Sequence, residues 1–243
     1  NLLGALFNTL QYRRFVETIG KLAQFKDEFD LSQDNNIEGL YYLFVNIHTI
    51  ERHYLEGTFS EGIAQAPEIM KIIESERYHW DDHRILIFYY RIACLYFGSG
   101  DNNTAIHYLN LIINQKNPDY REDIQCFARI LNLIAHFELG NAQLVEYQVK
   151  SVYRFLSKME DLHGVQREIF RFLRKTPKMR EPEMKSEFLS LREKLVKLED
   201  QPFERRPFLY LDIISWLESK IEETAVQTII RRKFLKRIED KSV

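Results

Sequence analysis

The sequence is poor in the residues that build tight turns. Only six prolines and nine glycines occur among its 243 residues, fewer than a sheet-rich fold with many turns would use. Long helices joined by short connections fit this shortage better. Since 45% of the residues are apolar and 13% are aromatic, the chain has ample material for a buried core.

Cysteine is scarce as well. The two cysteines, Cys94 and Cys126, both lie in apolar runs, so we expect packing residues rather than a disulfide scaffold or a catalytic thiol. This usage favours a reducing compartment, and the cytoplasm is the expected location. That location is provisional, because the chain starts at Asn1 rather than at a methionine and is expected to be a fragment or a processed product.

An excess of charge of one sign and long apolar runs are also lacking. The 34 basic and 36 acidic residues leave a formal net charge of −2, which creates no field to attract nucleic acid or an anionic membrane. No stretch approaches the roughly 20 uninterrupted apolar residues that a membrane span needs. We therefore expect neither a nucleic-acid partner nor a membrane span.

What the sequence does have is helical periodicity along nearly its whole length, without sustained strand-type alternation. Three of the breaks contain turn glycines, Gly57, Gly100 and Gly140, which are 43 and 40 residues apart. Each glycine follows an aromatic helix end and precedes a second amphipathic helix, so stacked helical hairpins are predicted. The sequence predicts one all-α domain over residues 1–243, with hairpins at about 1–29, 37–75, 81–117, 121–160, 163–200 and 206–238.

The repeat around Gly100 has the most detailed pattern. A small residue, Ala93, lies seven positions before the glycine and an aromatic residue, Tyr96, lies four before it, while Ala105 lies five after it and Pro118 closes the second helix. This arrangement resembles the tetratricopeptide repeat. The chain is similar to a large group of uncharacterised bacterial tetratricopeptide-like proteins. This resemblance implies stacked antiparallel hairpins that form a right-handed superhelix, an α-solenoid, whose last one or two hairpins cap the stack.

The pattern departs from that family in two respects. The steps of 43 and 40 residues exceed the usual tetratricopeptide period of about 34. The position of Ala105 is Gly62 in the repeat around Gly57, but it is the larger Val145 in the repeat around Gly140. The two-carboxylate clamp of chaperone-binding tetratricopeptides is not expected, because the positions that it needs are mainly apolar.

Polar stripes on otherwise apolar helices supply the candidate binding residues. Polar side chains occur at i, i+3 and i+7 of two predicted helices, and two arginines and a tyrosine lie on the helix between them. In a tetratricopeptide-like stack the first helices of successive hairpins line the concave face, where a peptide or a helix would bind. The predicted groove residues are Asn46, Thr49, His53, Arg84, Tyr90, Arg91, Arg129, Asn132 and His136.

The same residues admit a second interpretation. Polar side chains between adjacent helices can satisfy one another, as buried polar groups generally must. The sequence does not decide between the two interpretations, because an error of one residue in helical phase moves a stripe to another face.

No catalytic, cofactor or metal site is predicted, and we do not expect an enzyme. His79 and His83 lie four residues apart, but Trp80 occupies the position at which a zincin helix needs glutamate, and no third ligand is evident. Asp81 or Asp82 is instead expected to cap the helix that follows.

A basic segment lies near the C-terminus. Its five cations within seven residues are Arg231, Arg232, Lys233, Lys236 and Arg237. They would suit nucleic acid or anionic lipid, but cations at a helix C-terminus also complement the helix dipole. The second interpretation is favoured, since no nucleic-acid module or stacking aromatics accompany the segment.

The predicted function is that of a protein-interaction scaffold that binds a peptide or a helix of a partner protein in its concave groove. The alternative is a peptide-responsive regulatory module, in which binding changes the curvature of the stack and controls an output domain missing from this fragment. Neither the identity of the partner nor the oligomeric state is predicted.

Overall fold

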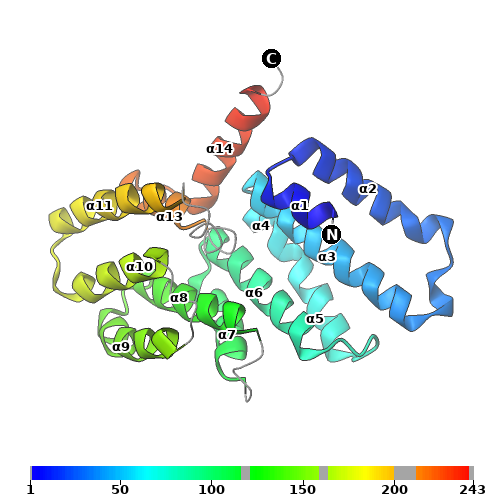
Figure 1. Cartoon of the computed structure of the whole chain (residues 1–243), viewed down its shortest axis with the longest axis horizontal. Helices are drawn as coiled ribbons and strands as arrows, with labels where there is room; N and C mark the ends of the chain where they lie inside the picture. Colours follow the sequence, from blue (N-terminus) through cyan, green and yellow to red (C-terminus); the bar gives the residue numbers. More distant parts are fainter. Residues whose placement is uncertain (1, 116–120, 159–163, 200–211, 241–243) are drawn as a thin grey trace.

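The computed structural model describes residues 2–115, 121–158, 164–199 and 212–240. Within these ranges every regular element is helical, and none is a strand (Figure 1). The all-helical class predicted from the periodicity is therefore confirmed for the described part of the chain.

Most of the described helices contact the next described helix along the chain. In addition, α3 contacts α6, α6 contacts α8 and α8 contacts α10. The elements are α1 (Leu2–Asn8), α2 (Tyr12–Glu28), a 3-10 turn (Leu31–Gln33), α3 (Asn35–Glu56), α4 (Phe59–Gly62), a 3-10 turn (Ile63–Gln65), α5 (Ala66–Glu74), α6 (Asp82–Ser99), α7 (Asn102–Ile113), α8 (Glu122–Glu138), α9 (Ala142–Lys158), α10 (Gly164–Lys175), a 3-10 turn (Thr176–Lys178), α11 (Glu181–Glu199), α13 (Ile213–Ile221) and α14 (Val226–Asp240).

Aspartates begin several helices and glycines end them. The side chains of Asp34, Asp81, Asp101 and Asp212 accept hydrogen bonds from first-turn amides of α3, α6, α7 and α13, which have no acceptor inside their helices. The expected cap before α6 is thus confirmed as Asp81. The three predicted turn glycines all have positive φ, at 68°, 94° and 72°, a conformation that costs a residue with a Cβ atom.

The last helix returns to the first third of the chain, which the sequence analysis did not predict. α14 contacts both α3 and α6 (Figure 1). At Gly57, a Cβ atom would lie 2.4 Å from the backbone nitrogen of Arg231, so only glycine permits this approach. Ser60 donates from its backbone nitrogen and its Oγ to Gln227 Oε1, at 3.2 and 2.9 Å. These contacts join α14 to the end of α3 and to α4.

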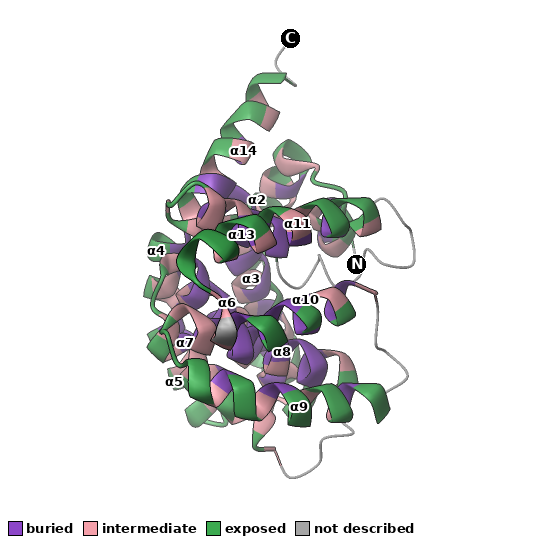
Figure 2. Ribbon diagram, turned by 90° about the vertical axis from the view of Figure 1, so that its left-hand side faces the viewer, coloured by how far each residue is buried: buried purple, intermediate pink, exposed green. Residues whose placement is uncertain are grey.

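The main hydrophobic core extends from α6 to α13, and a second core lies between α3, α5 and α6. Figure 2 shows that buried residues face the neighbouring helices, whereas the C-terminal end of α14 extends beyond them and is largely exposed. Trp216 of α13 is fully buried. Its ring lies 6.0 to 6.3 Å from those of Phe137, Phe172 and Phe188, which come from α8, α10 and α11. α13 therefore seals one side of the main core.

Candidate functional site

Residues of α6, α8, α10 and α13 line a small, largely apolar cavity. Its lining residues are Tyr90, Phe127, Ile130, Val165, Gln166, Ile169 and Ile213. Its volume is about 10 Å³, which is room for one water molecule at most. Among the described residues, this central cavity is part of the packed core and is too small for a peptide side chain.

A charged cluster lies beside this core, between α3 and α6. Glu51 accepts a hydrogen bond from Arg91 Nη2 at 2.6 Å, and its second carboxylate oxygen lies 2.5 Å from His48 Nδ1. The side chains of Glu51 and His48 are 4% and 3% exposed, and that of Arg91 is 23% exposed. Burial raises the pKa of Glu51, but the charge of Arg91 and the hydrogen bond from His48 outweigh it, so the net pKa is lowered. Glu51 is therefore held as a carboxylate that fixes the Arg91 guanidinium.

Aromatic rings surround the histidine of this cluster. Phe15 of α2 meets the His48 ring edge-on at 6.1 Å, and Phe44 lies parallel to it at 6.2 Å. Phe44 is 37% exposed. Arg91 Nε is buried and has no acceptor within hydrogen-bond distance among the described residues. We name Phe44, His48, Glu51 and Arg91 the α3–α6 site, because they combine an exposed ring with a fixed donor.

Three of the predicted groove residues belong to α6, but only one of them is part of the α3–α6 site. Arg91 is part of the α3–α6 site, and Tyr90 lines the central cavity. Arg84, seven residues before Arg91, lies on the same side of the helix. It pairs with Asp81 at 3.3 Å and its side chain is 37% exposed.

The predicted stripe on α8 packs against neighbouring helices. Arg129 donates to the backbone oxygen of Gln125 at 3.0 Å, and its guanidinium lies 3.8 Å from the centre of the Phe155 ring of α9. Asn132 is buried and donates to Asn110 Oδ1 of α7 at 3.3 Å. The third residue of the stripe is His136, whose Nδ1 lies 3.1 Å from Nδ2 of Asn141 in the turn after α8. These contacts favour the interpretation in which the polar residues satisfy one another between helices.

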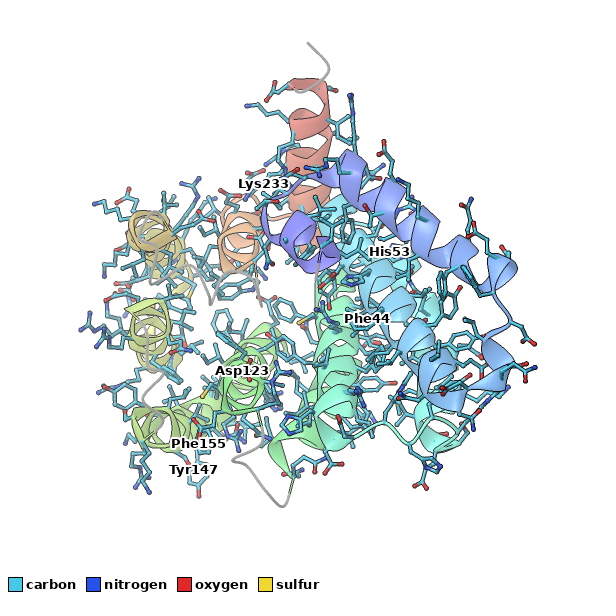
Figure 3. The ribbon with its side chains drawn as sticks, turned by 45° about the vertical axis from the view of Figure 1, so that its right-hand side comes forward. Phe44, His53, Asp123, Tyr147, Phe155 and Lys233 are labelled. Carbon is cyan, nitrogen blue, oxygen red and sulfur yellow. The ribbon has the colours of Figure 1, made fainter. Side chains whose placement is uncertain are left out.

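The predicted stripe on α3 lies away from the α3–α6 site. Asn46 and Thr49 donate to backbone oxygens of their own helix at 2.8 and 2.7 Å. His53 Nδ1 lies 2.7 Å from Thr58 Oγ1, and burial lowers the pKa of His53. Phe44 and His53, both labelled in Figure 3, are nine residues apart and so lie about 180° apart on the helix. The structure therefore does not bring the nine predicted residues to one surface.

Sequence reasoning missed Phe44, His48 and Glu51. The signal was present, because these residues and Leu55 fall at i, i+4, i+7 and i+11 of the helix over Asn35–Glu56. That spacing marks one face of a helix. On this face, His48 and Glu51 lie next to the apolar Leu55, which indicates that the two ionisable side chains are buried. Arg91 is the cation that pairs with Glu51.

The basic segment of α14 is largely engaged within the molecule. Arg231 donates to the backbone oxygen of Glu56 at 3.2 Å, and Arg232 binds both carboxylate oxygens of Glu222. Lys233, labelled in Figure 3, pairs with Glu218 of α13 at 2.6 Å. These cations attach α14 to its neighbours.

His79 and His83 do not share a helical turn, because α6 begins only at Asp82 and His79 has a positive φ in the preceding turn. Across the described ranges, no group of three His, Cys, Asp or Glu side chains could hold a metal ion. Both cysteines are buried thiols, and burial raises the pKa of Cys94 to about 12. None of the described helices has the combined length and apolar character that crossing a membrane requires.

No family model matches the chain, and no curated protein and no solved structure matches it either.

Proposed function

We propose that this chain is a tetratricopeptide-like interaction module, a right-handed superhelical stack that binds a segment of a partner protein at the α3–α6 site. The succession of packed helices and the left-handed turn glycines support this proposal. One observation carries it: the partly exposed Arg91 guanidinium, fixed by the buried Glu51, lies on the same network as the exposed Phe44 ring.

The chemistry of the site suits a peptide backbone with an apolar side chain. Glu51 holds the Arg91 guanidinium through Nη2, so its other N–H groups are fixed before a ligand arrives. A fixed donor loses little conformational entropy on binding. A peptide carbonyl would accept from Arg91, and the flat Phe44 face would bury an apolar or aromatic side chain.

The experiment is a selection of peptides on the purified protein, followed by calorimetric titration of the selected sequences. Phe44→Ala is expected to weaken binding by about tenfold or more, because a ring at the centre of an interface is often a dominant contact. Its matched control is Tyr147→Ala, which removes an 81% exposed ring from α9. Circular dichroism checks that both variants are folded.

Arg91→Gln is a second variant, but it leaves Glu51 buried without its cation and is expected to destabilise the fold. Binding is therefore compared at a temperature at which this variant is still folded. Selected peptides that bind Phe44→Ala and wild type equally well would show that the site lies elsewhere.

A regulatory function is the second candidate, and the return of α14 favours it. α14 contacts α3 and α6, the two helices that carry the α3–α6 site. A ligand that shifts these helices relative to each other would change the contacts of α14. Hydrogen exchange over residues 226–240 tests this, since a scaffold predicts no change on peptide binding and a regulator predicts a clear one.

A further inference from the structure

A second concave surface lies where the two ends of the described chain meet. The turn between α1 and α2, the end of α3 and the face of α14 enclose a hollow of about 190 Å³. Its walls are formed mainly by Leu10, Tyr12, Leu55, Phe234 and Ile238. We name it the terminal hollow. The volume of the terminal hollow is below that of a typical small-molecule site, which is about 300–1,000 Å³. The hollow can still admit one inserted side chain.

Three arginines line the same hollow, Arg13, Arg14 and Arg237. Arg14 donates to the neutral Gln11 Oε1 at 2.9 Å, and Arg237 Nε donates to the backbone oxygen of Lys233 at 3.3 Å. Within the described residues, neither Arg14 nor Arg237 forms an ion pair with a carboxylate. The hollow therefore has an apolar floor and a positively charged rim.

Two carboxylates in this region have other partners. Glu56 accepts from the Tyr12 hydroxyl at 2.6 Å and pairs with Arg52 at 2.5 Å. Asp212 acts on Arg237 by charge alone, and its carboxylate caps α13. Burial lowers the pKa of Arg237, although a guanidinium remains protonated in proteins. An external carboxylate would offset this cost of burial.

The first turn of α2 adds to the positive potential. It contains no acidic residue, and Gln11 makes no side-chain capping hydrogen bond. Arg13 and Arg14 thus lie at the positive end of the helix dipole, where cations are disfavoured and anions are favoured.

Leu10 is held at the rim in a strained conformation. Its φ is +54° and its side chain is 43% exposed. A leucine in this conformation is destabilising and glycine would be preferred. The backbone N–H of Gln11 donates to the Leu6 oxygen at 2.9 Å, so the left-handed conformation of Leu10 ends α1 and leaves its side chain at the rim.

We propose that the terminal hollow docks an acidic segment of a partner protein, which inserts one apolar side chain and places carboxylates against Arg14 and Arg237. An extended polyanion fits less well. Arg231, Arg232 and Lys233 are engaged within the molecule, so these cations of α14 do not extend the rim into a broader basic surface. The apolar floor would also have no use in binding phosphate groups.

The test uses fluorescence anisotropy with a labelled twelve-residue peptide that carries one phenylalanine between glutamates. Wild-type protein is expected to bind it, and replacing either the phenylalanine by alanine or the glutamates by glutamines should weaken binding about tenfold. Arg14→Gln and Arg237→Gln should each weaken binding about three- to fivefold, in the range of partly exposed charge pairs. Arg174→Gln, at an exposed arginine of α10, is the matched control and should change nothing.

Leu10→Gly separates docking from folding. Glycine relieves the strained turn, so thermal stability should not fall, yet the rim loses its apolar side chain and peptide affinity should drop. Phe44→Ala should leave this peptide's affinity unchanged, which keeps the outcome independent of the α3–α6 site. Unchanged affinity of an Arg14→Gln, Arg237→Gln double variant overturns the proposal. So does tighter, arginine-dependent binding of polyuridylate or phosphatidylserine vesicles, which would make the hollow a general anion site.

Discussion

The two sides of α6 differ in what covers them. Toward α8, α10 and α13, the helix contributes Tyr90 to a packed apolar region in which Trp216 contacts three phenylalanines. Toward α3, it contributes Arg91 to a charged cluster beside a partly exposed ring. The first region is closed by α13, whereas Phe44 in the second is 37% exposed in the described structure. Whether a face of α6 is buried thus depends on which helices from later in the chain pack against it.

The largest expected effect comes from opening the closed side with Trp216→Ala. Removing a fully buried tryptophan should lower the free energy of unfolding by about 3–5 kcal/mol, because the cavity adds to the lost transfer free energy. It also leaves Glu138 Oε1 without the indole N–H that donates to it at 2.7 Å. Urea denaturation measures the change.

Phe44→Ala is the matched control on the other side. Since Phe44 is already 37% exposed, its loss should cost less than about 2 kcal/mol. Equal losses in the two variants would mean that the α3–α6 side is as much a core as the side that α13 covers.

An intermediate effect is expected for Arg129→Ala. The substitution removes the contact with Phe155 and the hydrogen bonds to Gln125 and to the Ile113 backbone oxygen. These contributions predict a loss of about 1–3 kcal/mol. Arg84→Ala, which breaks only a local pair with Asp81, should cost less than about 0.5 kcal/mol. Thermal unfolding of both variants decides whether the α8 stripe is structural, since a stable Arg129→Ala protein would restore it as a candidate surface.

Helix existence and helix ends were predictable because their causes are local. The glycines at Gly57, Gly100 and Gly140 and the cap at Asp81 act on neighbouring backbone groups, so the sequence near each one predicts them. The rotational phase of a helix is different. Arg129 packs against α7 and α9. An arginine that faced a ligand instead could occupy the same position in the sequence pattern.

The return of α14 was unpredictable for a related reason. Gly57 is sufficiently explained as a turn glycine, and nothing near it indicates that the backbone of Arg231 approaches it. The charged cluster between α3 and α6 also depends on a contact between segments about 40 residues apart. Periodicity describes one helix at a time and does not pair faces of different helices.

The smallest expected effect is the loss of stability at low pH. It distinguishes the two sides of α6, because the buried carboxylate Glu51 lies on only one of them. The pKa of Glu51 is lowered in the folded state, so its ionised form stabilises the fold. This contribution is complete above the unfolded pKa of about 4.3 and is lost as pH falls through the lower folded value. Glu51→Gln removes the titrating group and should flatten the fall in stability as the pH drops below the unfolded pKa, although it lowers stability at pH 7. Urea denaturation at several pH values measures this slope. Hydrogen exchange follows local opening. Acid should therefore first increase exchange in α3 and α6 and leave the region around Trp216 protected. Uniform loss of protection would show that both sides open as one unit.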